Sequence, residues 1–221
     1  MGKHITLTTS DKHSLGGYRA DPQGAPKGGL VVIQEIFGVN HHIRAVCDRL
    51  AEMGYVAVAP AVFDRFVRDF ETGYTPDEIA KARGYLGNLN WDHMVADMAA
   101  AAADLKGAGP IGVIGFCMGG TAAFLAACRV PGMSAAVAYY GGMIGKFADE
   151  KPKCPMQMHF GERTKAFRSA PSRRSSKSCR KRKSISIRAQ RTASIATSAQ
   201  ATTRRRPISH GAARRNSLRR T

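Results

Sequence analysis

One short stretch, Gly115–Gly120 (GFCMGG), constrains the fold more than any other part of this 221-residue chain. The apolar run before it, Ile111–Ile114, predicts a buried strand, and the run of helix formers after it, Thr121–Cys128, predicts a helix. A strand, a sharp turn flanked by glycines and a helix are together typical of a nucleophile elbow, whose strained backbone needs small neighbours. Cys117 occupies the position of the nucleophile in this turn.

The helix that follows Cys117 is expected to point its first backbone N–H groups at the sulfur. Such a position favours the thiolate, which is the nucleophilic form of cysteine. The alternative is a buried cysteine in an ordinary strand-to-helix turn, because glycine-rich turns after strands are common in α/β folds.

The rest of the chain up to residue 163 alternates between strand and helix patterns with short Gly and Pro joints, which indicates a doubly wound, mostly parallel α/β sheet. We predict strands at Lys3–Thr9, Leu15–Ala20, Gly29–Gln34, Tyr55–Pro60, Ser134–Tyr140 and Pro155–Phe160, and helices that run from Asn40 to about Met53, from Thr75 onward and from Trp91 to Lys106. The segment Val62–Tyr74 has a mixed composition and is predicted to be a surface excursion.

Charge divides the chain sharply in two. All 16 acidic residues lie at or before Glu162, whereas 18 of the 34 Lys and Arg residues follow Arg163. The net charge of +18 therefore belongs to the last 58 residues, Thr164–Thr221, which also lack apolar periodicity. We predict an α/β domain over residues 1–163, incomplete at its C-terminal end, and a disordered basic tail over residues 164–221.

Composition also limits the class of protein. The five cysteines have no paired spacing, which suits a reduced, cytoplasmic compartment better than a disulfide framework. No zinc-type spacing, signal peptide or apolar run of about 18 residues is evident, so we expect no metal, no cofactor and no membrane partner.

A nucleophilic thiol needs a base and donors for the oxyanion. Glu35 ends a buried strand at the sheet edge where α/β proteins place their sites, although it could instead face water. In this architecture the oxyanion donors are the N–H after the nucleophile and one from a neighbouring loop, which here are Met118 and Ile36.

Two stretches together, Val32–Asn40 (VIQEIFGVN) and the elbow, resemble the dienelactone hydrolase family, also called carboxymethylenebutenolidases. Tyr139–Gly141 and Phe160–Glu162 also fit, and the resemblance covers residues 1–163. It implies an α/β-hydrolase fold, a Cys-Asp-His triad and a Glu that helps to activate the thiol, which is Glu35 here. The implied substrate is a cyclic enol-lactone from aromatic degradation, opened through an acyl-thioenzyme.

The chain departs from the family pattern after Arg163. The family's Asp follows the strand that ends near Glu162, and its His lies in an H-G-F segment nearer the C-terminus. Here no acid follows Glu162, and the one downstream histidine, His210, is interpreted as a tail residue. His159 is expected in the middle of its strand, where it packs or faces a helix, and His41 and His42 are expected to form a partly exposed pair.

The genetic code suggests why. If the last base of each codon is joined to the first two of the next, Arg163–Ser169 can be reread as D-K-G-I-P-L. In the same frame Arg191–Thr197 can be reread as H-G-F-N-C-D, which supplies the missing motifs in the expected order. We therefore interpret the tail as out-of-frame sequence.

Our prediction is a dienelactone hydrolase-like enzyme that opens a small lactone or ester through a cysteine acyl-enzyme and is impaired in this chain. One alternative is a catalytically inactive α/β domain whose basic tail binds nucleic acid or an anionic surface. The tail has no aromatic residue except Phe167, so we expect no specific nucleic-acid partner. A second alternative is a cysteine-dependent esterase of the same fold that accepts a broader range of esters. The sequence does not determine the oligomeric state, and a monomer is compatible with it.

Overall fold

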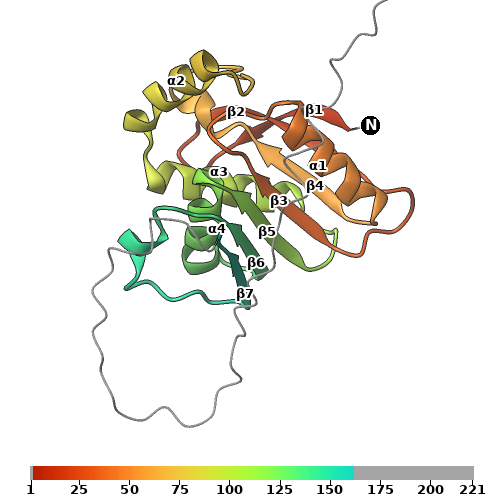
Figure 1. The fold of residues 1–221 in the computed structure, drawn as a ribbon. Helices are drawn as coiled ribbons and strands as arrows, with labels where there is room; N and C mark the ends of the chain where they lie inside the picture. The colour runs from red at the N-terminus through yellow and green to blue at the C-terminus, as the bar shows by residue number, and fades with distance from the viewer. Residues whose placement is uncertain (1, 162–221) are drawn as a thin grey trace, which may run out of the picture. The chain divides into compact units, whose positions relative to one another are not determined.

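The computed structural model describes residues 2–161. Within this range a seven-stranded sheet has the order β1-β2-β4-β3-β5-β6-β7 (Figure 1). The strands are β1 (Lys3–Thr8), β2 (Ser14–Ala20), β3 (Gly29–Ile33), β4 (Val56–Pro60), β5 (Ile111–Phe116), β6 (Met133–Tyr139) and β7 (Met156–His159). The predicted basic tail, with Phe167 and His210, lies outside the described residues.

The strand directions confirm the predicted doubly wound, mostly parallel sheet. β1 and β2 form an antiparallel hairpin, and β2 pairs antiparallel with β4. β3 pairs parallel with β4 and β5, and the pairings of β5 with β6 and of β6 with β7 are also parallel. The carboxyl ends of these parallel strands therefore meet at one edge, where such folds place their sites.

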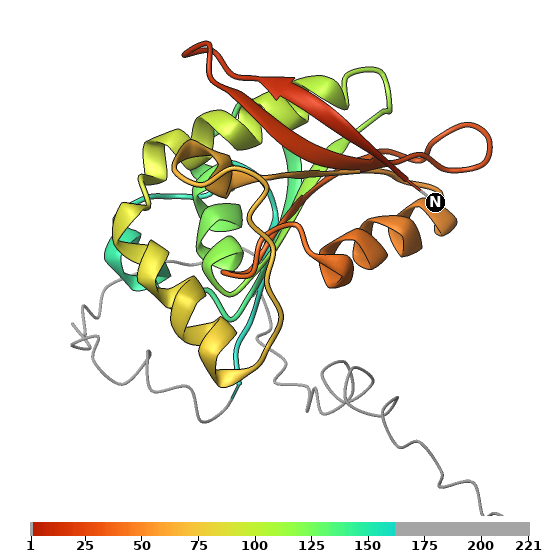
Figure 2. The same cartoon turned by 90° about the horizontal axis from the view of Figure 1, so that it is seen from above.

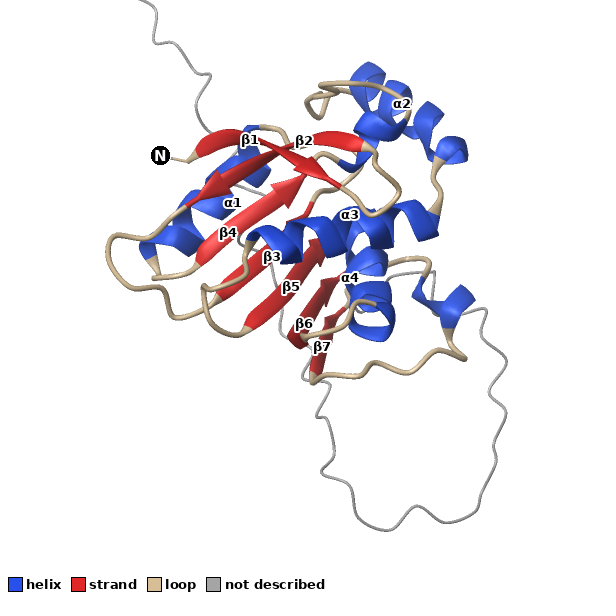
Figure 3. Ribbon diagram, turned by 180° about the vertical axis from the view of Figure 1, so that it is seen from behind, coloured by secondary structure: helices blue, strands red, loops and turns tan. Residues whose placement is uncertain are grey.

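Helices cover the sheet from both sides. The helices are α1 (His41–Glu52), α2 (Pro76–Gly84), α3 (Trp91–Asp104) and α4 (Met118–Arg129). α1 packs on β2, β3 and β4, whereas α3 and α4 pack on the opposite face, which Figure 3 shows from behind. No helix of the described segment is long and apolar enough to cross a membrane.

The helix starts follow directly from their capping residues. The Asn40 side chain accepts hydrogen bonds from the N–H groups of His42 and Ile43, at 3.2 and 3.3 Å. Thr75 and Glu78 form a reciprocal capping box at the start of α2, with Pro76 at the first helical position. Both predicted helix starts are confirmed because their signals are local to the sequence.

The prediction of a surface excursion over Val62–Tyr74 is only partly right, because Arg68, Asp69 and Glu71 are exposed but other residues of the segment enter the core. Val62, Phe63 and Phe70 are buried, and a short 3-10 turn covers Val62–Arg65. The Phe63 ring lies 5.6 Å from the Phe70 ring and 6.5 Å from that of Tyr85, centroid to centroid. Aromatic packing against a distant part of the chain therefore overrides the mixed composition of the segment.

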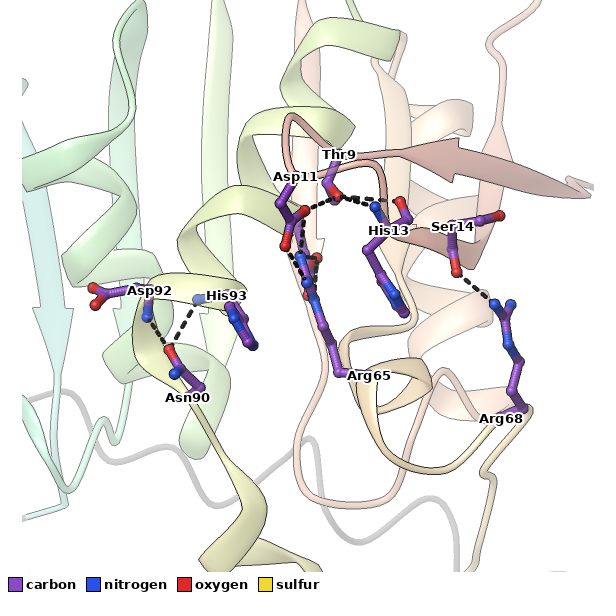
Figure 4. Close-up of polar contacts among 10 residues, drawn as sticks. Thr9, Asp11, His13, Ser14, Arg65, Arg68, Asn90, Asp92 and His93 are labelled. Atoms are coloured by element: carbon purple, nitrogen blue, oxygen red, sulfur yellow. Dashed lines mark hydrogen bonds and ion pairs between the residues drawn. The ribbon is translucent and has the colours of Figure 1, made fainter.

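An ion-pair network centred on Arg65 fastens this segment to its neighbours (Figure 4). Arg65 contacts Asp97 of α3 at 2.7 Å and Asp11 of the first hairpin turn at 2.6 Å. The Asp97 side chain is fully buried, with 0% of it exposed. Its charge therefore depends on Arg65, because a buried carboxylate without a partner is strongly unfavourable.

One side of the sheet is only partly covered by the described residues. α1 lies over β2, β3 and β4 and does not extend over β6 or β7 (Figures 1 and 2). On that side Val137 and Tyr139 of β6 are half-buried and Ala135 is exposed. An α/β sheet normally buries both faces, so this is where the described domain lacks a helix.

The Arg65 network leads to a stability prediction. Arg65→Met should lower the free energy of unfolding by about 3 kcal/mol, because Asp97 would lose its partner. Arg68→Met is the control, since Arg68 is mostly exposed, its ion pair with Asp64 is 3.8 Å long, and Asp64 keeps hydrogen bonds from two backbone N–H groups without it. Because the variant also loses a hydrogen bond from Arg68 to the Ser14 carbonyl, we expect a loss of about 1 kcal/mol, measured by urea denaturation with Trp91 fluorescence. Equal losses in the two variants would contradict the assigned role.

Candidate active site

The predicted elbow is present between β5 and α4. Cys117 has φ 56° and ψ −117°, a region that non-glycine residues rarely adopt. Its N–H donates to the Tyr139 carbonyl at 3.0 Å, and its own carbonyl accepts from the Gly120 N–H at 3.0 Å. Bonds to a neighbouring strand and to the first helical turn thus hold the cysteine in a strained position at the carboxyl edge of the sheet.

The elbow glycines are required by close backbone packing. A Cβ added to Gly115 would lie 1.9 Å from the Gly119 carbonyl oxygen, and one on Gly120 would lie 2.4 Å from that of Tyr139. A Cβ on Gly119 would lie 2.5 Å from the Ile33 carbonyl oxygen of β3. These contacts explain the small residues that the sequence places around Cys117.

The pKa of the Cys117 thiol is raised, whereas the sequence analysis considered only the helix N–H groups that lower it. Burial raises the pKa of Cys117, a hydrogen bond from the Met118 N–H lowers it, the negative charge of Glu35 raises it and Arg83 lowers it. The net direction is upward, so the resting thiol is protonated at neutral pH. The Met118 N–H favours the thiolate, as expected at a helix start, but desolvation outweighs it.

Glu35 lies beside the elbow because β3 and β5 are neighbours. Their pairing ends with Ile33 opposite Gly115, so the residues after each strand leave the sheet together. Glu35 is half-buried, and its Oε1 accepts a hydrogen bond from the Tyr140 hydroxyl at 3.3 Å. Burial raises the pKa of Glu35, while the Tyr140 hydrogen bond lowers it. A carboxyl group with a raised pKa beside a thiol is suited to proton transfer.

The two predicted oxyanion donors lie at the same edge. Met118 begins α4, and its N–H already interacts with the Cys117 sulfur. Ile36 is buried and follows Glu35 directly. Their roles as oxyanion donors remain predictions from the architecture.

Three further residues act on Cys117 or Glu35, and the sequence analysis gave none of them a role. Tyr140 follows β6, has φ 42° and is 43% exposed. Tyr74 accepts a hydrogen bond from Asn40 Nδ2 at 3.4 Å, and the charge of Glu35 contributes to raising its pKa. Arg83 of α2 acts on the thiol through its charge. Only Tyr140 had a sequence signal, because it ends a predicted strand and lies in the Tyr139–Gly141 stretch that fits the family.

The histidines of the described range take structural positions. His159 stacks on the Tyr139 ring at 4.7 Å between centroids, which confirms the predicted packing, but it ends β7 and does not lie in the middle of the strand. His41 is exposed and His42 half-buried, as expected of a partly exposed pair. Within residues 2–161, no group of three or more His, Cys, Asp or Glu side chains is placed to hold a metal ion.

The fold and the strained elbow define an α/β hydrolase. The model of the dienelactone hydrolase family matches residues 15–188, so the chain belongs to that family. It is 33% identical over 183 residues to the carboxymethylenebutenolidase of Pseudomonas putida, covering 76% of this chain and 74% of that protein. A carboxymethylenebutenolidase homologue from Synechocystis sp. is 38% identical over 159 residues, covering 68% of this chain.

The match to several curated relatives is partial. The chain spans 64% of the Synechocystis protein and 50% of a relative from Methylorubrum extorquens. Among solved structures, a dienelactone hydrolase family member from Klebsiella pneumoniae has a TM-score of 0.58 at 28% identity, with 73% of each chain covered. Dienelactone hydrolase from Anabaena variabilis has a TM-score of 0.55 at 17% identity over 73% of this chain, which shows the shared fold.

The site generates a prediction about thiol reactivity. Iodoacetamide should label Cys117 before Cys47 and Cys128, because both of these are buried and burial raises the pKa of Cys47 to about 12. Burial raises the pKa of Cys117 as well. Its alkylation rate should therefore keep increasing with pH beyond the pH at which the rate of a free cysteine becomes constant. Mass mapping of the labelled peptides between pH 6 and 10 measures both effects. Equal labelling of the three cysteines would contradict the accessible position of Cys117.

Proposed function

We propose that this chain carries the catalytic site of a hydrolase that opens a small lactone or carboxylic ester through a thioester on Cys117. The observation that carries the proposal is the strained elbow, which presents Cys117 at the sheet edge with Glu35 beside it. The names of the relatives support lactone opening in particular.

The first half-reaction uses groups within the described residues. Glu35 takes the proton from the Cys117 sulfur, and the thiolate attacks the substrate carbonyl carbon. The carbonyl π bond becomes an oxyanion, to which the N–H groups of Met118 and Ile36 donate. When the oxyanion collapses, the ring C–O bond breaks and the leaving oxygen takes the proton from Glu35.

The second half-reaction needs a base for water. Water must attack the thioester carbonyl, and the Cys117 thiolate must leave and regain a proton. By family resemblance an Asp and a His would serve here, but the sequence has no acid after Glu162. We therefore propose that this chain acylates and then deacylates very slowly.

Arg83 suggests which substrates fit. Its guanidinium charge reaches the thiol, so a substrate bound at Cys117 lies within its field. We propose a lactone that carries a carboxylate, in keeping with an enol-lactone from aromatic degradation. We also propose a cytoplasmic location, in line with four free cysteines in the described range.

The frame hypothesis is tested by expressing the chain as given beside a form corrected by one base after the Arg163 codon. The corrected form should hydrolyse a dienelactone with many turnovers, while the given chain should consume at most about one equivalent of lactone per site and keep it bound as the thioester. The corrected form should also be more soluble, because a helix over β6 and β7 would bury apolar surface at about 25 cal/mol per Å². Multiple turnovers by the given chain would contradict the proposed impairment; Cys117→Ala in the corrected form is the control for background hydrolysis.

The charge of the last 58 residues supports one rival, a nucleic-acid-binding arm. Duplex DNA binding by the full chain should be weak, sensitive to salt and independent of sequence, because any polycation binds in this way. Deleting residues 164–221 should remove it. A clear sequence preference, measured by fluorescence anisotropy at several salt concentrations, would favour the rival.

A further inference from the structure

We propose that the Met1–Gly2 peptide bond is hydrolysed in the mature protein, and that Tyr18 and Asp48 bind the Gly2 ammonium group that results. This is the reaction of a methionine aminopeptidase. Water is consumed, the C–N bond breaks, methionine leaves with a new carboxylate and the Gly2 nitrogen becomes an ammonium group. The contacts of that nitrogen carry the inference, which is independent of the proposed function.

The Gly2 nitrogen faces two acceptors at once. Gly2 lies directly before β1, and its N–H donates to the Tyr18 hydroxyl of β2 and to Asp48 Oδ1 of α1, both at 2.9 Å. The Tyr18 hydroxyl donates to the same Asp48 oxygen at 2.9 Å, so the three atoms form a closed triangle. A peptide nitrogen has one hydrogen to share between the two acceptors, whereas an ammonium group has three. The site therefore suits an ammonium group better than an amide.

The charges at the site lead to the same conclusion. Asp48 is half-buried, and within residues 2–161 its carboxylate makes no ion pair. It accepts from two neutral donors, the Gly2 N–H and the Tyr18 hydroxyl. A carboxylate that is partly removed from water gains more from a positively charged donor than from a neutral one. An ammonium group on Gly2 would supply that charge.

Tyr18 is already oriented for this role. Burial and the hydrogen bond to Asp48 raise the pKa of Tyr18, while the Gly2 N–H lowers it, and the net direction is upward. The hydroxyl therefore stays protonated at neutral pH and gives its one hydrogen to Asp48, so its oxygen acts as an acceptor toward Gly2. The Tyr18 side chain is buried, and the His4 ring packs edge-on against it at 5.8 Å between centroids.

Only glycine fits at position 2. An added Cβ would lie 2.4 Å from the Arg19 carbonyl oxygen and 2.8 Å from the Tyr18 ring. A glycine after methionine is also the context in which the methionine is removed. Met1, Gly2 and Thr6 match a pattern for fatty acylation of the Gly2 nitrogen as well, but an acyl amide would again offer one hydrogen and no charge. The contacts therefore favour the free ammonium group.

The ion pair would fasten the edge of the sheet to a helix. In the described sheet β1 is an edge strand with β2 as its one neighbour, and α1 packs on β2. An ammonium group on Gly2 that binds Asp48 would link β1 directly to α1.

The first test is the mass of the purified full chain and of its N-terminal peptide. We expect the chain to begin at Gly2 with an unmodified amine. Retention of Met1, or an acyl group on the Gly2 nitrogen, would overturn the proposal.

The second test measures the Gly2–Asp48 contact by acetylation with a limiting amount of acetic anhydride at pH 7. The Gly2 amine should react about tenfold faster in Asp48→Asn than in the wild type, the factor expected when a hydrogen bond loses its charged acceptor. Glu52→Gln is the matched control, because Glu52 is exposed one turn further along α1, and it should leave the rate unchanged. Exposed Lys12 serves as the internal rate standard. Equal Gly2 rates in the wild type and Asp48→Asn would overturn the proposal.

An extended form separates the effect of the ammonium charge from a general loosening of the fold. A glutamine inserted between Met1 and Gly2 blocks removal of the methionine and keeps the Gly2 nitrogen as an amide. Asp48→Asn should lower the urea concentration at half-unfolding more in the wild type than in the extended form, because only the wild type has an ion pair to lose. An equal shift in both backgrounds would overturn the proposal. None of these measurements depends on lactone hydrolysis.

Discussion

The close approach of α4 to the ends of β3, β5 and β6 is the constraint on which the rest of the site depends. Gly115, Gly119 and Gly120 leave no room for a Cβ, because backbone oxygens lie within 2.5 Å of where each would stand. This packing forces Cys117 into its strained conformation and brings Glu35 and Tyr140 to either side of it. A methyl group at any of the three positions would separate the elements that build the site.

The same packing surrounds Cys117 with groups that shift the pKa of its thiol in opposite directions. Burial and the neighbouring carboxylate keep Cys117 protonated, while the Met118 N–H and Arg83 oppose them. In the mechanism that we propose, such a thiol becomes a strong nucleophile when Glu35 accepts its proton. The raised pKa of Glu35 makes that transfer less costly than it would be to an exposed carboxylate.

Local signals explain how much the sequence could predict. The strands, the caps at Asn40 and Thr75 and the elbow depend on neighbouring residues, and all are present. The burial of Phe63 and Phe70 depends on Tyr85, which is distant in sequence, so composition misled there. The sign of the thiol pKa shift depends on desolvation by the whole fold, and the Tyr140 contact spans 105 positions. Neither can be read from a local pattern.

The central claim is that Cys117 forms a covalent acyl-enzyme. Mass spectrometry of the chain as given, mixed with excess dienelactone and quenched in acid, tests it most directly. Because the leaving oxygen of a lactone stays attached, we predict that one equivalent of the whole substrate mass is added to the peptide that carries Cys117, and that Cys117→Ala gains none. An unmodified Cys117 in the wild type, or the same added mass on another residue, would contradict the claim.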